Sequence, residues 1–545
     1  MPALPGHRSP LLLELDLTEL PVEPDSADPL ARLRVRGRRQ LRPTLRALYE
    51  AADDPRVVGL VARVGGALAW AAMQELRLGV LAFAESGKPT VAWAESFGES
   101  GDTAAYVLAT AFDQIWLQPG GGVGLLGVAT ETTFLRGALD RLGVQPEFEQ
   151  RREYKNAVNT FTRTAYTDAH REALEALTAS VFAEAVEQIA AGRRIDPDRV
   201  RELVDTGPRT APEAESSGLV DQLGYRDQVH AALRSRVGED AELLFADRWT
   251  PSRRPKLPRP RRGRVALVQA RGTIVGGRSR RGAMGRQLGS DSVSAELRAA
   301  LADDHVRAVV LHVDSPGGSA VASESIWREV SRVSDSGRPV VVSMGALAAS
   351  GGYYIAAPAD VIVALPSTLT GSIGVFGGKL VVSDLLERFG LTTDAVQQGD
   401  RSRMFSSRRP FGDEERARFA ATVDAIYDDF VAKVAAGRGR SVAEIDEVAR
   451  GRVWTGRDAL AVGLVDELGG LRDAVRIART RADLPDDAPV VPALNVPPLA
   501  RLGRPRNSDD PRAQAGLAWP GLAELTAALG LPVGAELRMP GLELR

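Results

Sequence analysis

Short β-branched runs alternate with longer amphipathic stretches along most of this chain. In its second half, RVALVQARGTIV (264–275), RAVVLHVDS (307–315) and PVVVSMG (339–345) are typical of buried strands. SAVASESIWREVSRVSDSG (319–337) predicts a helix, and a further helix is expected after Ser350. The order strand, helix, strand, helix favours an α/β layered fold with right-handed crossovers.

The same pattern occurs twice, at a shift of about 245 to 250 residues. SGKPTVAW (86–93) matches SGRPVVVS (336–343), and SGLVDQLG (217–224) matches VGLVDELG (462–469). AYVLATAFDQIWLQP also matches GYYIAAPADVIVALP, and AAGRR matches AAGRG. Near the N-terminus, LLLELDLTEL resembles VALVQARGTI, the predicted first strand of the second half. Matches in the same order at nearly one offset predict an internal duplication.

The duplication predicts four parts, namely a first copy over 1–248, a linker over 249–264, a second copy over 265–480 and a tail over 481–545. A helical appendage, ATVDAIYDDFVAKVAAGRGRSVAEIDEVARG, belongs to the second copy. Alternating prolines and basic residues predict an extended, solvated linker. The alternative is a contact between this polybasic segment and anionic lipid headgroups. The tail is rich in Pro, Leu and Arg, and its WPGLAELTAALGLPVG stretch fits one short amphipathic helix.

Composition removes several classes of chemistry. The 545 residues contain no cysteine, which excludes disulfides, thiolate metal sites and a cysteine nucleophile. The formal net charge of −2 gives no global field that points to nucleic acid. The N-terminus lacks a signal-peptide pattern, and no run of about 18 apolar residues predicts a membrane span. We therefore expect a cytoplasmic protein, with peripheral contact with the inner face of the cell membrane as an option.

The stretch ALAASGGYYIAAPAD (346–360) carries the most informative hydroxyl. Ser350 follows a predicted strand and precedes a predicted helix, so its Oγ points out of the sheet edge. The N–H of Gly351 can bind a developing negative charge, which suits acyl transfer. The alternative is a helix N-cap serine.

Two other glycine-bearing segments follow predicted strands. In DSPGGS (314–319), Pro316 fixes a turn while Gly317 and Gly318 free the backbone to present N–H groups. The alternative is a simple turn before a helix. The glycines of TGSIGV (370–375) indicate tight backbone packing or a plain turn.

A nucleophilic serine needs a base. The five histidines show no Ser/His/Asp order, and His312 lies within a predicted strand, where a core role is favoured. Lysine is the remaining option if burial lowers its pKa from about 10.4 toward 7. Only five lysines occur in the chain.

The duplication narrows the choice of lysine. At a shift of 247, Thr103 of the first copy stands opposite Ser350, and Ser402 of the second copy stands opposite Lys155. One copy therefore holds the serine and the other holds the lysine, which predicts a site shared between the two halves of the duplication. Lys379 is the rival base, although its GGKL setting is more typical of a loop.

DSPGG, AASGGYY and TGSIGV, in this order and spacing, resemble the signal peptide peptidase A or protease IV family of serine peptidases (family S49), with a Clp/crotonase-like fold. The resemblance covers roughly residues 10 to 480 and matches the long, tandem-domain form of the family. It implies a homo-oligomer, with a tetramer favoured. Long-form members often carry an N-terminal membrane anchor, and none is visible here.

The resemblance also implies roles for individual residues. Ser350 corresponds to the nucleophile, and Lys155, in REYKNAVNTF, corresponds to the general base. The oxyanion hole would use backbone amides of the SPGG turn and of the residue after the nucleophile, and Ser372 could orient the lysine. The oxyanion and substrate-binding residues are then Gly317, Gly318 and Gly351.

We therefore expect a serine endopeptidase whose Ser/Lys dyad is split between two tandem Clp/crotonase-like α/β domains with helical appendages. No metal or nucleotide cofactor is expected, and no GxxxxGK[ST] phosphate loop indicates ATP-driven unfolding. The expected substrates are signal peptide remnants or other unfolded hydrophobic peptides. One alternative is an acyl-CoA hydratase or isomerase of the crotonase type, and another is a non-catalytic oligomeric scaffold.

Overall fold

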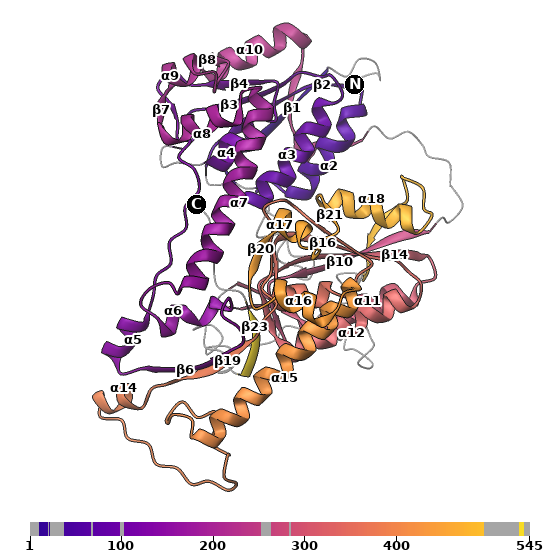
Figure 1. Ribbon diagram of the computed structural model, residues 1–545. Coiled ribbons are helices and arrows are strands. Elements are labelled where there is room, and N and C mark those ends of the chain that lie inside the picture. The colour runs from indigo at the N-terminus through magenta and orange to yellow at the C-terminus, as the bar shows by residue number, and fades with distance from the viewer. Residues whose placement is uncertain are drawn as a thin grey trace. The chain divides into compact units, whose positions relative to one another are not determined.

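The computed structural model describes residues 10–19, 21, 38–66, 69–98, 103–251, 263–282, 285–494 and 534–538. The chain divides into two compact units (Figure 1). Unit 1 contains residues 1–129 and 179–259, and unit 2 contains residues 130–178 and 260–544. The division falls within helix α7 (Asp168–Arg193). Segment 130–178 therefore lies within the predicted first copy in sequence but belongs to unit 2 in the structure.

A parallel sheet forms the centre of unit 1. Its strand order is β8-β4-β3-β2-β1-β9, and all five neighbouring pairs are parallel. The strands are β1 (Leu11–Leu17), β2 (Val57–Val64), β3 (Thr90–Ala94), β4 (Gln114–Leu117), β8 (Gln222–Leu223) and β9 (Glu242–Phe245). Helix α10 (Arg226–Val237) covers one face, where Val229 and Leu233 pack with Val61 and Trp93.

Unit 2 repeats this sheet. Its strands follow the order β21-β17-β16-β14-β10-β22, again all parallel. They are β10 (Arg264–Arg271), β14 (Val306–Ser315), β16 (Val340–Ala349), β17 (Val361–Ala364), β21 (Glu467–Leu468) and β22 (Val490–Pro492). Strands β18 (Leu369–Gly371) and β20 (Val453–Thr455) extend the far end of β16. Because the two sheets have corresponding strand orders, the topology shows the duplication that the sequence predicts.

Individual contacts are duplicated as well. The buried Tyr106 hydroxyl donates to Leu219 O at 2.7 Å, and the buried Tyr353 hydroxyl donates to Leu464 O at 2.8 Å. The same arginine–aspartate pair also recurs, between Arg193 and Asp221 and between Arg438 and Asp466. In each unit these contacts hold the segment after a six-residue helix, 219–221 or 464–466, to a buried tyrosine and to the last residue of a long helix.

The sheet of unit 2 is buried on both faces, which explains its continuous apolar strands. In β14, Val309 and Leu311 join the core on one side, while Ala308 and Val310 join the cluster on the other side. Helices α11 (Ser290–Ala302), α12 (Ala320–Asp335) and α13 (Gly351–Ala356) contribute to the first, and α18 (Leu471–Arg481) contributes to the second. Burial of each valine or leucine side chain among these is worth about 1.5–3 kcal/mol.

A second, mixed sheet of unit 2 has the order β12-β13-β11-β15-β23-β19-β6. Its strands are β6 (Gln145–Gln150), β11 (Thr273–Val275), β12 (Arg280–Gly282), β13 (Gly285–Gly289), β15 (Gly317–Ser319), β19 (Phe376–Val381) and β23 (Gly534–Arg538). Strand β6 brings segment 130–178 into this sheet through six antiparallel pairings with β19. The sheet therefore joins residues from three distant parts of the sequence.

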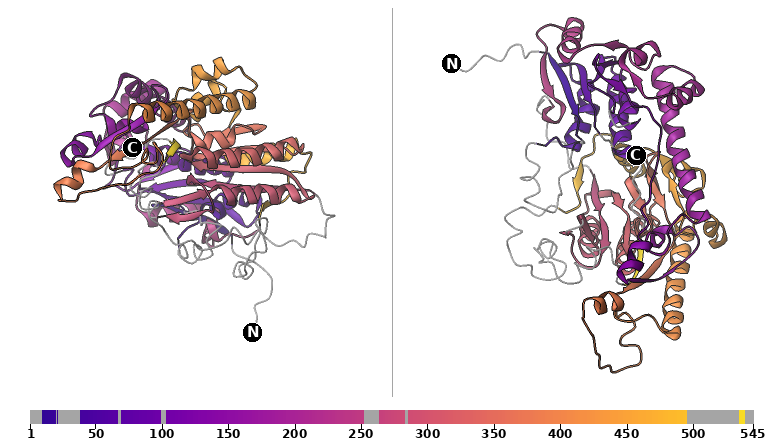
Figure 2. Two further views of the ribbon diagram at one scale, coloured as in Figure 1. Left: turned by 90° about the horizontal axis from the view of Figure 1, so that it is seen from below. Right: turned by 90° about the vertical axis from the view of Figure 1, so that its left-hand side faces the viewer.

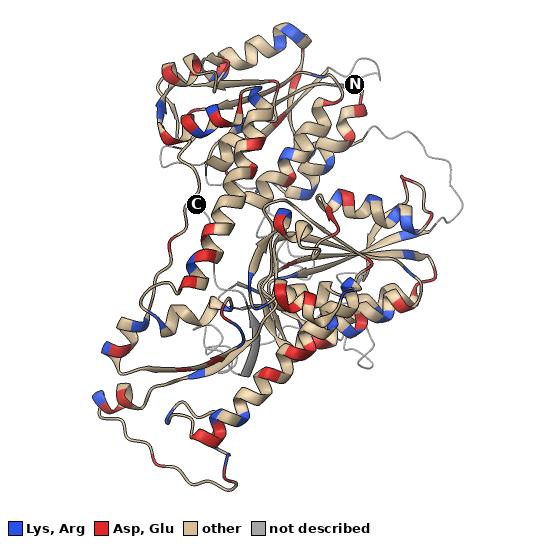
Figure 3. Cartoon of the chain, viewed as in Figure 1, with Lys and Arg blue, Asp and Glu red and all other residues tan. Residues whose placement is uncertain are grey.

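The remaining elements are short or peripheral. They are α2 (Leu41–Glu50), η1 (Ala51–Asp53), α3 (Trp70–Ala84), α4 (Thr103–Ala109), β5 (Gly122–Val123), α5 (Arg136–Leu142), η2 (Asn156–Val158), α6 (Asn159–Thr162), α8 (Pro197–Asp205), β7 (Arg209–Thr210), α9 (Ala211–Ser216), η3 (Ala246–Arg248), α14 (Ser383–Arg388), α15 (Asp413–Arg438), α16 (Val442–Val448) and α17 (Gly456–Ala461). Figure 3 shows acidic and basic residues along α15 and α7, while the strands are mostly uncharged.

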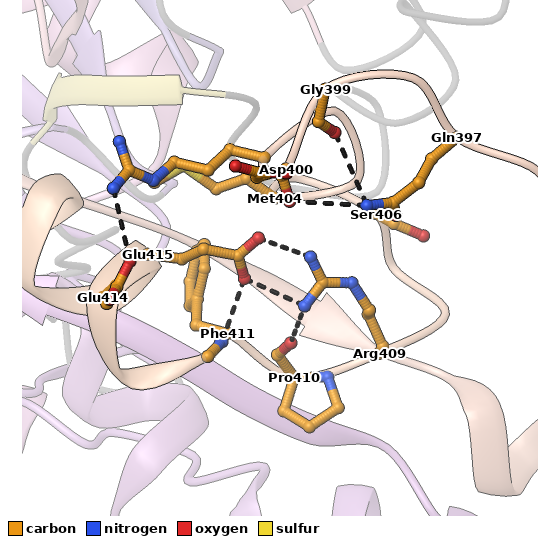
Figure 4. A network of polar contacts seen from close by, with 12 residues as sticks. Gln397, Gly399, Asp400, Met404, Ser406, Arg409, Pro410, Phe411, Glu414 and Glu415 are labelled. Atoms are coloured by element: carbon orange, nitrogen blue, oxygen red, sulfur yellow. Dashed lines mark hydrogen bonds and ion pairs between the residues drawn. The ribbon is translucent and has the colours of Figure 1, made fainter.

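Residues 383–412, which we call the arm, connect β19 to α15. Figures 1 and 2 show the arm, in orange, extending away from the rest of unit 2. Its attachment to α15 is held by an ion pair between Arg409 and Glu415, and Glu415 also accepts from Gly412 N at 2.9 Å (Figure 4). Buried Glu147 of β6 accepts from Phe411 N at 2.6 Å. The base of the arm is therefore fixed while its middle is exposed.

Local structure differs from the sequence-based expectation at two places. Residues 317–319 form strand β15 rather than a simple turn, because they pair with β11 on one side and β23 on the other. Lys379 lies in strand β19 rather than in a loop. Gly378 permits this pairing because a Cβ at that position would overlap Glu147 O of β6.

Other predicted segments fall largely outside the described residues. They are residues 252–262 of the predicted linker and all but the last residue of the predicted tail helix, 519–534. Among the helices described, none is both long enough and apolar enough to cross a bilayer.

Candidate active site

Ser350 occupies a strained junction between β16 and α13. Its backbone has φ 56° and ψ −117°, which a serine adopts only at a cost of about 1–3 kcal/mol. Its N–H donates to Gly371 O at 2.8 Å, and the residue is fully buried. The side chain makes no capping hydrogen bond to α13. The Ser350 hydroxyl therefore does not act as the N-cap of α13.

Lys155 reaches the serine hydroxyl from the segment that follows β6. Its Nζ lies 2.8 Å from Ser350 Oγ, 2.8 Å from Ser372 O and 3.1 Å from Ser372 Oγ. The lysine is completely buried. The structure thus brings together three of the residues singled out in the sequence, and all three lie within unit 2.

Burial lowers the pKa of this lysine. Desolvation at its completely buried position holds the pKa of Lys155 well below its usual value. A neutral amine has two N–H donors and one lone pair. Lys155 Nζ is placed to donate to Ser350 Oγ, Ser372 O and Ser372 Oγ; a neutral amine that donates to the two Ser372 acceptors would have its lone pair toward Ser350 Oγ.

Backbone contacts hold the Lys155 segment in place. Arg151 N donates to Val375 O at 2.9 Å, and Tyr154 N donates to Arg450 O at 3.2 Å. Gly451 has φ 83°, and a Cβ there would lie only 2.5–2.7 Å from the N, Cα and Cβ atoms of Lys155. A glycine is therefore required for this close approach. Sequence analysis did not single out Gly451, whose setting after α16 resembles an ordinary helix end.

Ser372 shares the unusual backbone of Ser350. Its φ is 50°, and its N–H donates to Arg452 O at 2.6 Å. Next to it, Gly374 lies against the lysine stem, since a Cβ on this glycine would be 3.2 Å from Lys155 Cδ. The tight packing expected for TGSIGV is thus packing around the lysine.

The SPGG segment lies against the start of α13. Ser315 Oγ accepts from Gly317 N at 3.1 Å and donates to Gly272 O at 2.7 Å, which fixes the strand entry. A Cβ on Gly351 would lie 3.2 Å from Gly318 N and 3.1 Å from Gly317 Cα. The two backbone segments expected to hold an oxyanion are therefore adjacent.

The rival base and the first-copy hydroxyl lie elsewhere. Lys379 Nζ donates to Met404 O at 2.8 Å and lies 4.0 Å from the centroid of the Phe411 ring. Thr103, at the start of α4, donates to Gly127 O at 2.9 Å. Over the described residues, no group of three or more His, Asp or Glu side chains is arranged to hold a metal ion.

A buried serine hydrogen-bonded to a buried lysine is an arrangement found in serine-type hydrolases. The model of peptidase family S49 matches residues 82–239 and 332–485. Protease 4 of Salmonella typhi is 34% identical over 449 residues, which cover 80% of this chain and 71% of that protein. The chloroplastic serine protease SPPA of Arabidopsis thaliana is 29% identical over 471 residues, or 84% of this chain and 67% of that protein.

Among solved structures, a mutant of ClpP1 from Listeria monocytogenes aligns with 39% of this chain and 94% of that chain, at 16% identity and a TM-score of 0.25. The chain belongs to peptidase family S49, and it is a serine-type endopeptidase. The expected α/β fold with an internal duplication is confirmed by the two matched regions and by the two parallel sheets.

Proposed function

We propose that this peptidase cleaves peptide bonds with a dyad of Ser350 as nucleophile and Lys155 as general base. The contact that carries the proposal is the 2.8 Å separation of Lys155 Nζ and Ser350 Oγ at a lysine whose pKa is lowered by complete burial. A lowered pKa makes the lone pair of such a base available at a lower pH than that of an ordinary lysine.

In the proposed reaction, Lys155 accepts the Ser350 proton while Oγ bonds to the peptide carbonyl carbon. Backbone N–H groups of Gly318 and Gly351 stabilise the oxyanion that forms. The Lys155 ammonium then protonates the leaving amine as the C–N bond breaks. Water, deprotonated by the same lysine, hydrolyses the acyl-enzyme and restores Ser350.

Ser372 acts in this scheme as a positioning residue. An ammonium has three N–H donors, and Ser350 Oγ, Ser372 O and Ser372 Oγ are three matching acceptors. The ammonium that forms in each half-reaction is therefore stabilised without a carboxylate. After the proton leaves, the two Ser372 acceptors direct the lone pair back toward the nucleophile.

The proposed substrates are extended hydrophobic peptides, including signal peptide remnants. Support comes from the name of one relative, putative signal peptide peptidase SppA, and from the glycine-rich strand β15, which lies beside Gly351, the residue after the serine. The location remains a prediction, with the cytoplasm and the inner membrane face as the candidates. The full burial of Ser350 without a capping bond weighs against the scaffold alternative.

We also propose a homo-oligomer, with a tetramer favoured, whose contacts use the arm. Phe389 is 75% exposed and Val396 is 96% exposed, while Phe405 is more than half exposed. Apolar side chains at such exposure on one segment are typical of an interface. Light scattering after size exclusion should show a smaller assembly for Phe389→Asp/Val396→Asp than for wild type, and an unchanged mass would contradict this role for the arm.

The experiment that tests the dyad is hydrolysis of hydrophobic fluorogenic peptides by wild type, Ser350→Ala, Lys155→Ala and Lys379→Ala, with folding checked by circular dichroism. We expect the first two variants to lose at least about 1,000-fold in kcat/KM. Lys379→Ala is the matched control and should stay active. Equal cleavage by wild type and Lys155→Ala would show that the base is another group.

A further inference from the structure

The described segment of the C-terminal tail forms a strand inside the second sheet of unit 2. Strand β23, residues 534–538, runs antiparallel to β15 on one side, where Gly317 pairs with Arg538. It also runs antiparallel to β19 on the other side, where Gly378 pairs with Gly534. The segment is therefore a central strand, held by backbone pairing along both edges.

This strand runs directly past the proposed catalytic centre. Leu537 pairs with Gly318, whose N lies 3.2 Å from the position of a Cβ on Gly351. Gly351 immediately follows the nucleophile Ser350. A peptide whose carbonyl is to be attacked at Ser350 must pass the same two backbone segments. Strand β23 and such a peptide therefore compete for one place.

The dimensions of the gap fit one extended chain. Adjacent strands lie about 4.8 Å apart, so β15 and β19 are separated by about 9.6 Å, the width of one inserted strand. Four of the six positions paired with β23 are glycines, namely Gly317, Gly318, Gly377 and Gly378. These positions place no side chain beside the inserted strand. Recognition in this groove therefore depends on backbone hydrogen bonds and tolerates varied sequences.

We propose that residues 534–538 are an intramolecular peptide ligand that occupies the substrate groove and inhibits the peptidase competitively. This inference rests on the proposed function, because it assigns the occupied groove to the same site. A tethered segment acts at an effective concentration on the order of millimolar, so weak intrinsic affinity suffices for occupancy. Peptide substrates must displace the strand, which raises their apparent KM and leaves kcat unchanged.

The test uses full-length Glu536→Pro. Glu536 pairs with both Ser319 and Phe376, so its N–H faces one of the two strands, and proline removes that donor. We expect KM for a fluorogenic peptide to fall several-fold at constant kcat. Glu536→Ala keeps the backbone donor and should behave like wild type, as should Ala513→Pro elsewhere in the tail. Intact mass spectrometry verifies that each chain retains its C-terminus.

A binding measurement makes the result independent of turnover. A fluorescein-labelled peptide of residues 531–541, LPVGAELRMPG, should bind Ser350→Ala/Glu536→Pro more tightly than Ser350→Ala, as measured by anisotropy. If wild type cleaves substrates but Glu536→Pro changes neither KM nor peptide binding, the inference is wrong while the proposed function stands. If no variant cleaves but Glu536→Pro improves peptide binding, the proposed function fails and occupancy of the groove stands.

The source of the inhibiting strand is tested by dilution. An intramolecular ligand makes specific activity independent of enzyme concentration, which is the expected result. Inhibition that grows with enzyme concentration and disappears in Glu536→Pro would overturn the intramolecular assignment, because the strand would then come from a second copy of the chain.

Discussion

Complete burial of Lys155 predicts a measurable coupling between stability and pH. Its folded-state pKa lies well below the unfolded value of about 10.4, because burial disfavours the charged form. Between these two values the unfolded state binds one more proton than the folded state. The free energy of unfolding therefore rises with pH by about 1.4 kcal/mol per pH unit from this residue alone. Below the folded-state pKa both states bind the proton, and above about 10.4 neither does.

The perturbation that isolates this contribution is Lys155→Met, which keeps an unbranched stem and removes the titrating amine. Other groups that titrate equally in both proteins cancel in the difference between them. Wild type should gain stability relative to Lys155→Met by about 1.4 kcal/mol for each pH unit above the lowered pKa, until the gain ends near pH 10.4. Loss of the Ser372 contacts changes the difference in unfolding free energy by an amount that does not depend on pH. The slope of this difference against pH therefore reports the titration of Lys155.

The assay is pulse proteolysis in urea across pH 7 to 10, with fragments of β14 and β16 followed by mass spectrometry so that unit 2 is monitored by itself. Lys379→Met is the comparison variant. The pKa of Lys379 is also lowered by desolvation, but the charge of Glu147 opposes the effect, so its slope should extend over a narrower pH range. A pH-independent difference between wild type and Lys155→Met would mean that Lys155 is charged when folded, which would refute the neutral-base argument.

Three further predictions concern activity. The kcat/KM of wild type should rise with pH through the lowered pKa of Lys155, as a pH–rate profile would show, because only the neutral amine accepts the Ser350 proton; a flat profile would contradict this. Ser372→Ala should lower kcat by about 10- to 100-fold with little change in KM, which is part of the 10²–10⁴-fold contribution of a general base. A lower kcat that is accompanied by lower folding stability, with an unchanged pH profile, would indicate a structural role for Ser372. Gly451→Ala should inactivate the enzyme by displacing the Lys155 backbone, whereas Gly337→Ala, also at positive φ but facing open space, should stay active in the same peptide assay.

Much of the fold could be predicted from the sequence because its signals are local. Runs such as VVLHV and VVVSM are continuous and apolar since both faces of a parallel sheet are covered, and the helices between them follow from amphipathic spacing. The duplication also gave information about distant parts of the chain, because two segments that match in sequence are expected to occupy equivalent positions in the two sheets. The roles of Ser350 and Lys155 stay predictions, although their hydroxyl and amine lie at hydrogen-bonding distance.

Contacts between distant backbone segments could not be predicted in this way. Gly451 is required only because the Lys155 backbone approaches it closely, and nothing in the local sequence announces that neighbour. Strand β15 has two glycines among three residues, a composition that favours a turn, and its extended form depends on partners in β11 and β23. Strand β23 contains no β-branched residue and follows a stretch of the tail whose spacing fits an amphipathic helix.

The division of the chain explains why serine and lysine are separated in sequence. Segment 130–178 leaves the sheet of the first copy and pairs with the second copy through β6, so Lys155 reaches Ser350 rather than Thr103. Thr103 donates to a carbonyl instead, which needs no base. The corresponding segment of the second copy carries Ser402 opposite Lys155 and lies within the exposed arm. The duplicated chain thus contains one such serine–lysine contact among its described residues, and the second copy's counterpart of the lysine segment extends into the arm instead.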